Sequence, residues 1–312
     1  MCLGSSESWA TRVRVCVTDL RRGARRHDSW RPMTLLRVLS IVVLLPAFLT
    51  GCATTRLRLP DGPGSPLSDF RPLFDAAVAE CGRVQHLDAL IRLSGRGGGV
   101  RLNTRVRVRA GLSAPGSVRL EGLAPFGAPV FYLVAKPGRA TLLLTREKRV
   151  VQDVPAGEML ESLVGVSLSP AALRSVLTGC LVTDRQPTAA RTIGDWVAVD
   201  LAGGAVAYLQ RVDGVYRLTA GSRDGLAIYY SEFLRGLPRE VRVISDAGEA
   251  SDGAPHTDLT ASLSQVDTNV ALPDSAFEID IPSDVLPITL RELRGAGPLD
   301  APPESPASSA PR

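Results

Sequence analysis

The cysteine thiols are the side chains of this 312-residue sequence whose surroundings point most directly to chemistry. Cys52 follows the tripeptide Leu-Thr-Gly at the end of an apolar run, residues 38–49, that carries no charge. Arg31 and Arg37 lie on the N-terminal side of this run. A run of this length is typical of a signal-peptide h-region and is too short to cross a bilayer as a helix. The pattern therefore predicts a targeting segment that ends directly before a reactive thiol.

The motif Leu49-Thr50-Gly51-Cys52 resembles the lipobox at which bacterial lipoproteins are cleaved and lipidated. This resemblance implies that the mature chain begins at Cys52, with a thioether-linked diacylglycerol and an acylated amino group. Several acyl chains hold a protein firmly at a membrane, whereas one does not. Ala53 follows the cysteine, a pattern that accompanies outer-membrane sorting in enteric bacteria. We therefore expect an outer-membrane lipoprotein whose domain faces the periplasm; the alternative is an ordinary cysteine after a chance apolar stretch.

Charge is distributed unevenly between this leader and the rest of the chain. Residues 1–51 hold eight arginines and three acidic residues, and Met33 is a second candidate for the initiating residue. Subtracting these from the chain's 36 basic and 32 acidic residues leaves 28 basic and 29 acidic residues in 52–312. The remaining chain is near neutral, so the compositional support for nucleic-acid binding disappears.

Two cysteines remain once the leader and the lipidation site are set aside. Cys81 and Cys180 would lie in a compartment that permits disulfides. The sequence leaves two alternatives open, a Cys81–Cys180 disulfide or two buried free thiols, because pairing depends on geometry.

The groupings that enzymes require are missing from the sequence. Only His86 and His256 lie beyond residue 51, and neither a His-Glu-x-x-His nor a Cys-x-x-Cys spacing occurs. The glycine-rich residues 95–99 lack a following Gly-Lys-Ser/Thr and precede a strand, so we interpret them as a flexible hairpin connection. We therefore expect a protein that is not an enzyme, with no catalytic residue, no metal site and no cofactor.

Local signals divide the chain into a tether, a domain and a tail. Residues 52–67 are rich in Pro, Gly and Ser, which is typical of a tether between a lipid anchor and a folded domain. A helix is predicted next, capped by Ser68 or Asp69, with Pro72 in its first turn. The folded domain is expected to span 68–294. The Pro-, Ala- and Ser-rich residues 295–312 are expected to form a disordered tail without core residues.

Strand signals fill most of the domain. In residues 101–110 apolar side chains alternate with arginines, which is typical of a half-buried strand with one basic face. That face either binds anionic lipid or a protein, or is a solvated face that discourages edge pairing; we favour the second interpretation. One or two last strands are expected in 260–290, and the others at residues 117–121, 130–135, 140–145, 196–201, 206–212, 215–220, 226–233 and 240–244.

Two helices are predicted to interrupt this meander. The first covers residues 157–164, and the second begins after Ser169 as the cap, has Pro170 in its first turn and closes at Gly179. Asp213-Gly214 and Asp224-Gly225 are typical hairpin turns between the later strands.

These elements predict a mainly β fold, a curved antiparallel sheet or incomplete β-barrel of about eleven strands, because an open sheet of that size must curl or close. An N-terminal helix and two short helices are expected to cover an apolar cavity. Its predicted lining is Val106, Val108, Leu120, Leu133, Leu142, Leu144, Val197, Val199, Leu218 and Ile228. The predicted helical lid consists of Leu160, Leu163, Leu173 and Leu177.

Residues 87–179 resemble the LolB family of outer-membrane lipoprotein receptors. The resemblance lies in a strand ending at Ser94-Gly95, the turn Ala124-Pro125-Phe126-Gly127, and Leu163-Val164-Gly165 leading to Leu168-Ser169-Pro170. In that family an apolar residue on a projecting Pro and Gly turn helps to deliver lipid to the bilayer. The resemblance implies that Pro125, Phe126 and Gly127 form a membrane-insertion loop here. The alternative is that Phe126 folds back onto the sheet.

The C-terminal part of the domain is more similar to LolA-type carriers, through Asn269-Val270-Ala271-Leu272-Pro273 followed by Phe277. We therefore expect a member of the LolA/LolB lipid-binding superfamily. The implied function is to bind lipoprotein acyl chains or another lipid and to insert lipoproteins into the outer membrane, receiving them from a LolA-type periplasmic carrier. The alternative functions are those of a tethered structural or assembly lipoprotein, or of a carrier of another apolar ligand, with the same fold.

Overall fold

The computed structural model describes residues 58–98, 100–103, 107–124, 129–181, 186–245, 257–296 and 299. These residues all belong to one compact unit that begins at Arg58. Within them, no helix is both long and apolar enough to cross a membrane. The lipidation site Cys52 and the loop of Pro125, Phe126 and Gly127 lie outside the described residues.

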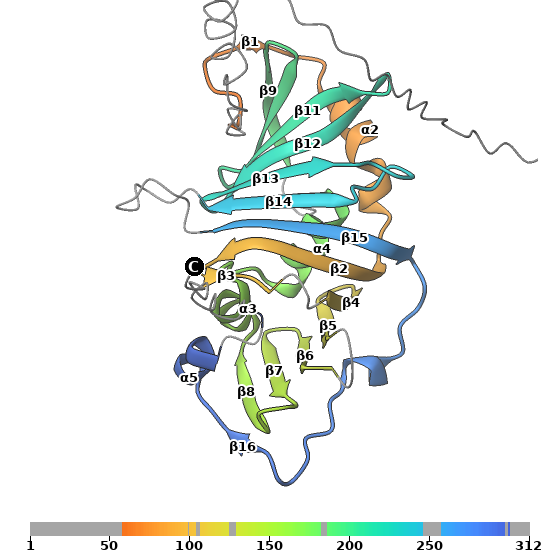
Figure 1. Ribbon diagram of the computed structural model, residues 1–312. Helices are drawn as coiled ribbons and strands as arrows, with labels where there is room; N and C mark the ends of the chain where they lie inside the picture. Colours follow the sequence, from red (N-terminus) through yellow and green to blue (C-terminus); the bar gives the residue numbers. More distant parts are fainter. Residues whose placement is uncertain are drawn as a thin grey trace, which may run out of the picture. The chain divides into compact units, whose positions relative to one another are not determined.

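One large, curved, open sheet forms the framework (Figure 1). Its strands in chain order are β1 (Ser65–Pro66), β2 (His86–Gly97), β3 (Val100–Arg101), β4 (Arg107–Ser113), β5 (Ser117–Leu123), β6 (Phe131–Lys136), β7 (Arg139–Leu144), β8 (Arg149–Pro155), β9 (Pro187–Ile193), β10 (Trp196–Leu201), β11 (Val206–Val212), β12 (Val215–Arg223), β13 (Leu226–Ser231), β14 (Glu240–Ser245), β15 (Asp258–Thr268) and β16 (Leu286–Pro287). The helices are α2 (Arg71–Gly82), α3 (Ala156–Val164), α4 (Pro170–Thr178), the 3₁₀ helix η2 (Asp274–Phe277) and α5 (Leu290–Ala296).

The order of strands in space differs from their order in the chain at the centre of the sheet. The path runs β1-β9-β10-β11-β12-β13-β14-β15-β2-β4-β5-β6-β7-β8-β16, and β3 pairs with β2 beside this path. All pairs are antiparallel except β16 with β8. The late strand β15 therefore joins β14 to the early strand β2, with Leu263 opposite Ile91.

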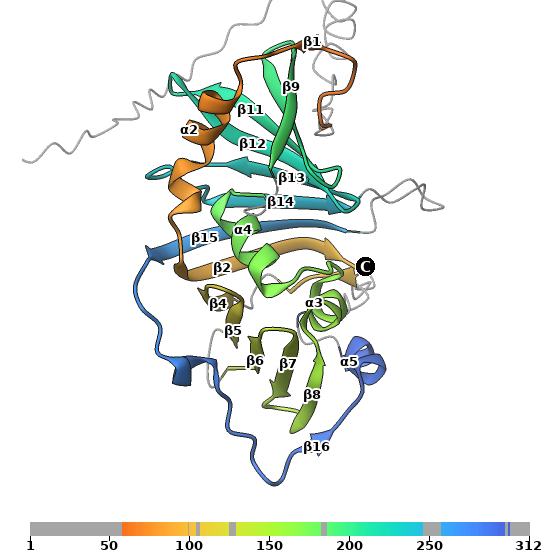
Figure 2. The same cartoon turned by 180° about the vertical axis from the view of Figure 1, so that it is seen from behind.

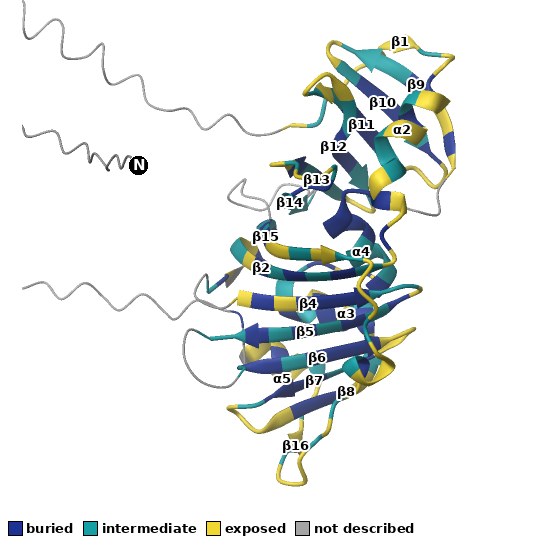
Figure 3. Ribbon diagram, turned by 90° about the vertical axis from the view of Figure 1, so that its right-hand side faces the viewer, coloured by how far each residue is buried: buried dark blue, intermediate teal, exposed yellow. Residues whose placement is uncertain are grey.

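The main hydrophobic core lies between one face of the sheet and the helices. Figure 2 shows α2 and α4 in front of the strands. α2 packs on β12, α4 on β4 and β5, and α3 on β2, β7 and β8. Buried side chains such as Leu87, Val108, Leu142 and Met159 belong to this core. In Figure 3 buried and less buried residues alternate along many strands, and the turns between strands are mostly exposed.

A smaller cluster occupies the opposite face near β10, β11 and β12. Ala198, Tyr208 and Ala220 are buried there, and Trp196 and Leu59 pack against them. The ring of Trp196 meets Tyr208 edge to face. The segment around Leu59 thus covers part of this second face.

The C-terminal segment after β15 crosses the sheet and returns to the helices. η2 packs on β5 and β6, and β16 then pairs with β8. α5 packs against α3, where Leu293 is fully buried. We call residues 269–296 the C-terminal strap.

The mainly β architecture is confirmed, but the number of strands is larger than the predicted eleven or so, with sixteen in the sheet among the described residues. Two full strands were missed. β8 contains Val150 and Val151, both buried, so it does not alternate, and β9 begins at Pro187 with few large apolar residues. The two-residue strands β1, β3 and β16 carry no periodic signal because they are too short.

The helix predictions are largely confirmed. Ser169 accepts a hydrogen bond from the Ala172 backbone N–H, Pro170 opens α4, and Gly179 ends it in the left-handed region at φ 79°. The predicted cap of α2 is wrong, because Phe70 is the N-cap residue and no side chain caps the helix. α2 is instead held by burial of its apolar face and by Pro at its start.

Two boundaries differ from the sequence predictions, and a third cannot be compared because it falls on residues that are not described. Ser65 and Pro66 of the predicted tether pair with β9, because sheet pairing needs only backbone groups. The arginine-rich strand is described from Arg107 onward as β4, and residues 104–106 of the predicted strand lie outside the described part of the chain. The predicted tail contributes a core residue, because Leu299 is 4% exposed and its carbonyl accepts a hydrogen bond from the Asn103 backbone.

Candidate functional site

An apolar cavity lies between the core face of the sheet and the helices α3 and α4. Its volume is about 110 Å³. Every side chain that lines it is apolar; the lining consists of Ile91, Leu93, Val108, Leu120, Phe131, Leu160, Leu163, Val164, Val166, Leu168, Leu173, Val176, Leu177, Val241, Val243, Leu259, Ala261 and Leu299. A site of this kind selects ligands by apolar surface and shape.

The floor of the cavity comes from six adjacent strands, β14, β15, β2, β4, β5 and β6. Alternate residues of each strand point to this face, which is why Ile91 and Leu93 of β2 both reach it. Gly122 stands opposite Phe131 in the pairing of β5 with β6. A Cβ on Gly122 would meet the Phe131 ring, so this glycine makes room for the aromatic wall of the cavity.

The roof of the cavity is formed by α3, α4 and the short connection between them. All four predicted lid residues, Leu160, Leu163, Leu173 and Leu177, line the cavity. Val166 and Leu168 of the connection complete the roof. Helical spacing puts each pair of leucines on one side of its helix, where it faces the sheet.

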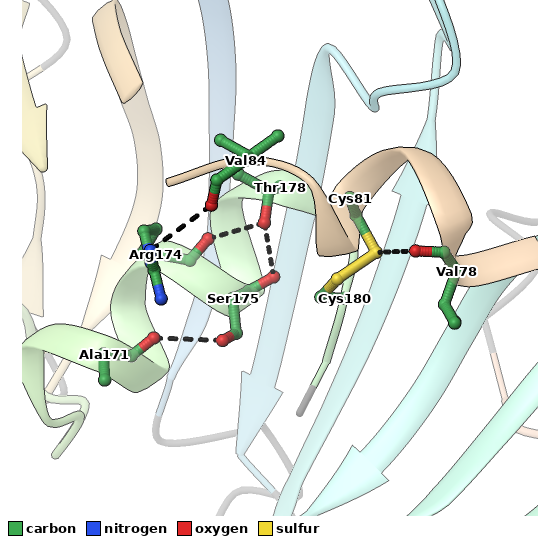
Figure 4. The surroundings of a disulfide bond; sticks show 8 residues. All are labelled: Val78, Cys81, Val84, Ala171, Arg174, Ser175, Thr178 and Cys180. Carbon is green, nitrogen blue, oxygen red and sulfur yellow. Dashed lines mark hydrogen bonds between the residues drawn. A yellow bond between two sulfur atoms is a disulfide. The ribbon is translucent and has the colours of Figure 1, made fainter. Parts of the chain in front are cut away.

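α4 is fastened at its C-terminal end. Cys180 forms a disulfide with Cys81 of α2, across a sequence separation of 99 residues (Figure 4). The Arg174 guanidinium donates to the Val84 carbonyl at 3.3 Å and to the Gln85 carbonyl at 3.1 Å. Partial burial lowers the pKa of Arg174 below its usual value. α4 is therefore tied to α2 by a covalent bond and to the start of β2 by hydrogen bonds.

α3 is fastened by close backbone contact at its own C-terminal end. Gly165 follows the helix in the left-handed region at φ 70° and touches the backbone of Gly98. A Cβ on Gly97 would likewise meet the backbone of Val164. The Thr257 hydroxyl donates to the Gly165 carbonyl at 3.2 Å and accepts from the Gly98 N–H at 3.3 Å. The glycine-rich segment predicted as a flexible connection therefore packs against the C-terminal end of α3.

The predicted cavity lining is correct only in part. Val108 and Leu120 line the cavity, and Val106 lies outside the described residues. The other seven do not line it and are buried in the surrounding core: Leu133, Leu142, Leu144, Val197, Val199, Leu218 and Ile228. Most of them stand on β7, β10, β12 and β13, which lie outside the run of floor strands in the sheet order; α2 packs on β12 and α3 packs on β7.

Four of the lining residues that the sequence did not predict share one cause. Val241, Val243, Leu259 and Ala261 lie on late strands that the sequence places far from Ile91 and Leu93. Their alternation with polar neighbours gives a usable strand signal. These local patterns do not predict the β15–β2 pairing, which brings the four residues to the centre of the sheet.

A polar hollow lies on the opposite face of the sheet, beneath the C-terminal strap. It is lined by Asp88, Arg109, Gly111, Arg119, Glu121, Leu272, Ala276 and Phe277. Arg109 pairs with Asp88 at 3.3 Å, and Arg119 pairs with Glu121 at 2.5 Å. Arg119 also donates to the Ala276 carbonyl at 3.0 Å. Arg119 therefore holds the strap, whereas Arg109 is exposed to water and pairs with a strand residue.

Grouped metal ligands are not found in the part of the chain that is described. His86 lies 3.0 Å from the Ser113 hydroxyl through its Nδ1, and His256 falls outside the described residues.

A buried polar side chain, that of Tyr230, stands opposite the cavity-lining residue Val241 in the pairing of β13 with β14. Tyr230 of β13 is 4% exposed, and its hydroxyl has no hydrogen-bond partner among the described residues. Burial raises the pKa of Tyr230 well above its usual value, so the hydroxyl stays protonated.

No protein-family model matches the sequence, and no curated protein sequence matches it. Solved structures that are similar include a LolA superfamily protein from Nitrosomonas europaea, with 9% identity and a TM-score of 0.44 over 66% of this chain and 98% of that chain. A DUF1329 family protein from Desulfovibrio piger has 13% identity and a TM-score of 0.38 over 68% and 98%. LprF from Mycobacterium bovis has 12% identity and a TM-score of 0.29 over 71% and 100%.

Proposed function

We propose that the protein binds the acyl chain of a lipoprotein or another lipid in the cavity under α3 and α4, in a binding rather than a catalytic role. The observation that supports this most directly is that all cavity-lining side chains are apolar. Each buried methylene contributes about 0.8 kcal/mol, so about ten methylenes of one acyl chain contribute roughly 8 kcal/mol.

Binding a whole chain requires the cavity to expand. Its volume of about 110 Å³ is below the roughly 300–1,000 Å³ of pockets that enclose drug-sized ligands. The roof consists of two nine-residue helices, each fastened mainly at its C-terminal end. We propose that their N-terminal halves and residues 166–168 move away from the sheet when a chain enters.

We further propose that the protein is a lipoprotein anchored through Cys52 in the outer membrane, where it helps to insert other lipoproteins that a LolA-type carrier delivers. Support comes from the lipobox-like motif and from the position of the end of β5. Pairing of Leu123 with Arg107, and of Arg107 with Arg92, puts the end of β5 at the same end of the sheet as Leu93. The proposed insertion loop therefore follows β5 at the end where Leu93 and Leu259 line the cavity.

The test is native mass spectrometry of residues 53–312 with a lipidated peptide and with its unlipidated copy. We expect binding that requires the acyl chain. Ala261→Leu, which adds volume to the cavity wall, should weaken binding at least fivefold while the protein stays folded. Val215→Leu is the matched control, because Val215 is 50% exposed and does not line the cavity. Equal binding of both peptides, or no effect of Ala261→Leu, would refute the proposed site.

A second candidate function is that of a tethered structural or assembly lipoprotein. The small cavity favours it, since a volume of about 110 Å³ is compatible with a core that never opens. In that case neither peptide binds in the experiment above, and the cavity-filling variant stabilises the protein without another effect.

A further inference from the structure

We propose that the Tyr230 hydroxyl donates a hydrogen bond to the carbonyl oxygen at the head of a bound acyl chain. This inference rests on the proposed function and names the polar contact that fixes the chain's direction and chemical class. The ligand is then an ester or amide of a fatty acid rather than a plain hydrocarbon.

The first support is the loss of stability that comes from burying a hydroxyl without a hydrogen-bond acceptor. Tyr230 is 4% exposed and its hydroxyl has no partner that satisfies hydrogen-bond geometry. The backbone of Leu181 lies near enough to oppose the upward shift of the Tyr230 pKa, but a backbone N–H offers no acceptor to the hydroxyl proton. A buried donor without an acceptor lowers the stability of the fold. Phenylalanine would fill nearly the same volume without that cost.

The second support is the position of Tyr230 at the border of the cavity. Tyr230 stands directly opposite Val241 in the pairing of β13 with β14, and Val241 lines the cavity. Both side chains belong to the main core, so they point to the same face of the sheet. Side chains opposite each other on neighbouring strands have Cβ atoms about 5 Å apart. An acyl chain that enlarges the cavity past Val241 therefore meets Tyr230.

The third support is the chemistry at that border. The cavity lining supplies no polar side chain, so a carbonyl group carried into it would lose its hydrogen bonds to water. The protonated hydroxyl offers one donor, which is what a carbonyl oxygen requires. Arg223 lies close by, but its guanidinium donates to the Leu181 carbonyl at 2.9 Å and pairs with Asp224. The Arg223 guanidinium therefore already has hydrogen-bond and ion-pair partners.

This contact also gives the bound chain a direction. Tyr230 pairs with Val241, Val241 with Ala261 and Ala261 with Leu93, so these residues form one row across four adjacent strands. Val241, Ala261 and Leu93 all line the cavity. The carbonyl head would sit beside Tyr230, and the hydrocarbon tail would run across the strands toward Leu93.

The experiment compares methyl palmitate with hexadecyl methyl ether, which differ by the replacement of one carbonyl by a methylene. Each lipid, delivered from cyclodextrin, competes with a fluorescent acyl probe bound to the wild-type protein, to Tyr230→Phe and to Tyr208→Phe. Tyr208 is buried in the small cluster on the opposite face and serves as the matched control. We expect the wild type and Tyr208→Phe to prefer the ester by about fivefold, as one net hydrogen bond provides. Tyr230→Phe should bind both lipids with the affinity that the wild type has for the ether.

Thermal unfolding of the unliganded variants gives a second measurement. Tyr230→Phe should unfold at the same temperature as the wild type or higher, because the hydroxyl it removes is unpaired. A wild type that binds both lipids equally, or a Tyr230→Phe variant that keeps the ester preference, would overturn the role of Tyr230 while leaving acyl binding intact. Failure of the wild type to bind either lipid would overturn this role together with the proposed function.

Discussion

At the scale of single residues, glycines decide how closely the lid approaches the sheet. Gly165 ends α3 at φ 70°, and a Cβ there would meet the backbone of Gly98. Backbone atoms cannot rotate away as a flexible side chain does, so any larger residue must push α3 from β2. The position of the cavity roof therefore depends on the fact that Gly165 has no Cβ atom.

Replacing Gly165 by alanine should lower the free energy of unfolding by about 2–4 kcal/mol, since a backbone clash adds to the strain of a left-handed alanine. Gly214→Ala is the matched control, because Gly214 has φ 81° but nothing within 4 Å of the added Cβ. Gly214→Ala should lower the free energy of unfolding by only about 1–2 kcal/mol. Urea unfolding measures both values, and equal losses would show that the contact with Gly98 does not matter.

At the scale of elements, the two lid helices are held by different means. α3 depends on backbone contact and on α5, whereas α4 depends on the Cys81–Cys180 disulfide. A bond that closes a long loop restricts the unfolded chain more than one that closes a short loop.

Replacing Cys81 and Cys180 together by serine should lower the free energy of unfolding by about 2–5 kcal/mol, because the bond spans a sequence separation of 99 residues. The same loss should follow from adding a reductant to the wild type. Urea unfolding with and without reductant checks this, and the double variant should not respond to reductant. If reduction leaves the wild-type midpoint unchanged, the bond does not stabilise the fold.

α5 begins with a reciprocal cap that depends on pH. The Glu292 carboxylate accepts from the Thr289 N–H and hydroxyl at 2.8 Å, and the Glu292 N–H donates to the Thr289 hydroxyl oxygen at 3.3 Å. These bonds lower the pKa of Glu292 below its usual value of 4.5. A lowered pKa in the folded state stabilises α5 above the usual value, and this contribution is lost as pH falls through the lowered pKa.

We therefore expect α5 to loosen against α3 below a pH of about 4. The methyl resonances of Leu293, which is fully buried, should shift or broaden in that range. Glu292→Gln keeps a capping side chain but does not titrate, so its Leu293 signals should not show this transition. A transition of the same size in Glu292→Gln would assign the loosening to other carboxylates.

At the scale of the whole molecule, the sheet consists of two series of strands that β15 joins. β2 and β4 to β8 lie on one side of it, and β9 to β14 lie on the other. The partners in this joint are far apart in the chain, since Asp258 pairs with Arg96 and Thr268 with Leu87. Such non-local pairing makes folding slow. The stability of both series of strands also depends on β15, because it pairs with β14 on one side and with β2 on the other.

A chain truncated after Ser245 should therefore not unfold as one cooperative unit, because β14 and β2 each lose a partner strand. A chain truncated after Leu299 retains every strand and is the matched control. Urea unfolding followed by tryptophan fluorescence and circular dichroism should give coincident transitions for the control only. Coincident transitions for the shorter chain would show that the halves fold together without β15.

Local patterns predicted the lid better than the floor. Ser169, Pro170 and Gly179 mark the ends of α4 within ten residues of one another, so the prediction needed only short-range physics. The four lid leucines followed from helical spacing. The floor residues Val241 and Leu259 carry ordinary strand patterns, and their place at the cavity depends on which strands become neighbours.

The sequence by itself determined the fold class, the two roof helices and the apolar side chains on them, because alternation, helical spacing and capping act between residues close in the chain. The tertiary structure alone decided which of the many buried side chains line the cavity. It also brought Cys81 to Cys180, seated Gly165 on Gly98 and left the Tyr230 hydroxyl unpaired beside Val241. These features depend on the pairing of β15 with β2 and on the packing of helices across the sheet. Contacts of that kind are fixed by the joint packing of the whole core, which no short segment of the sequence contains.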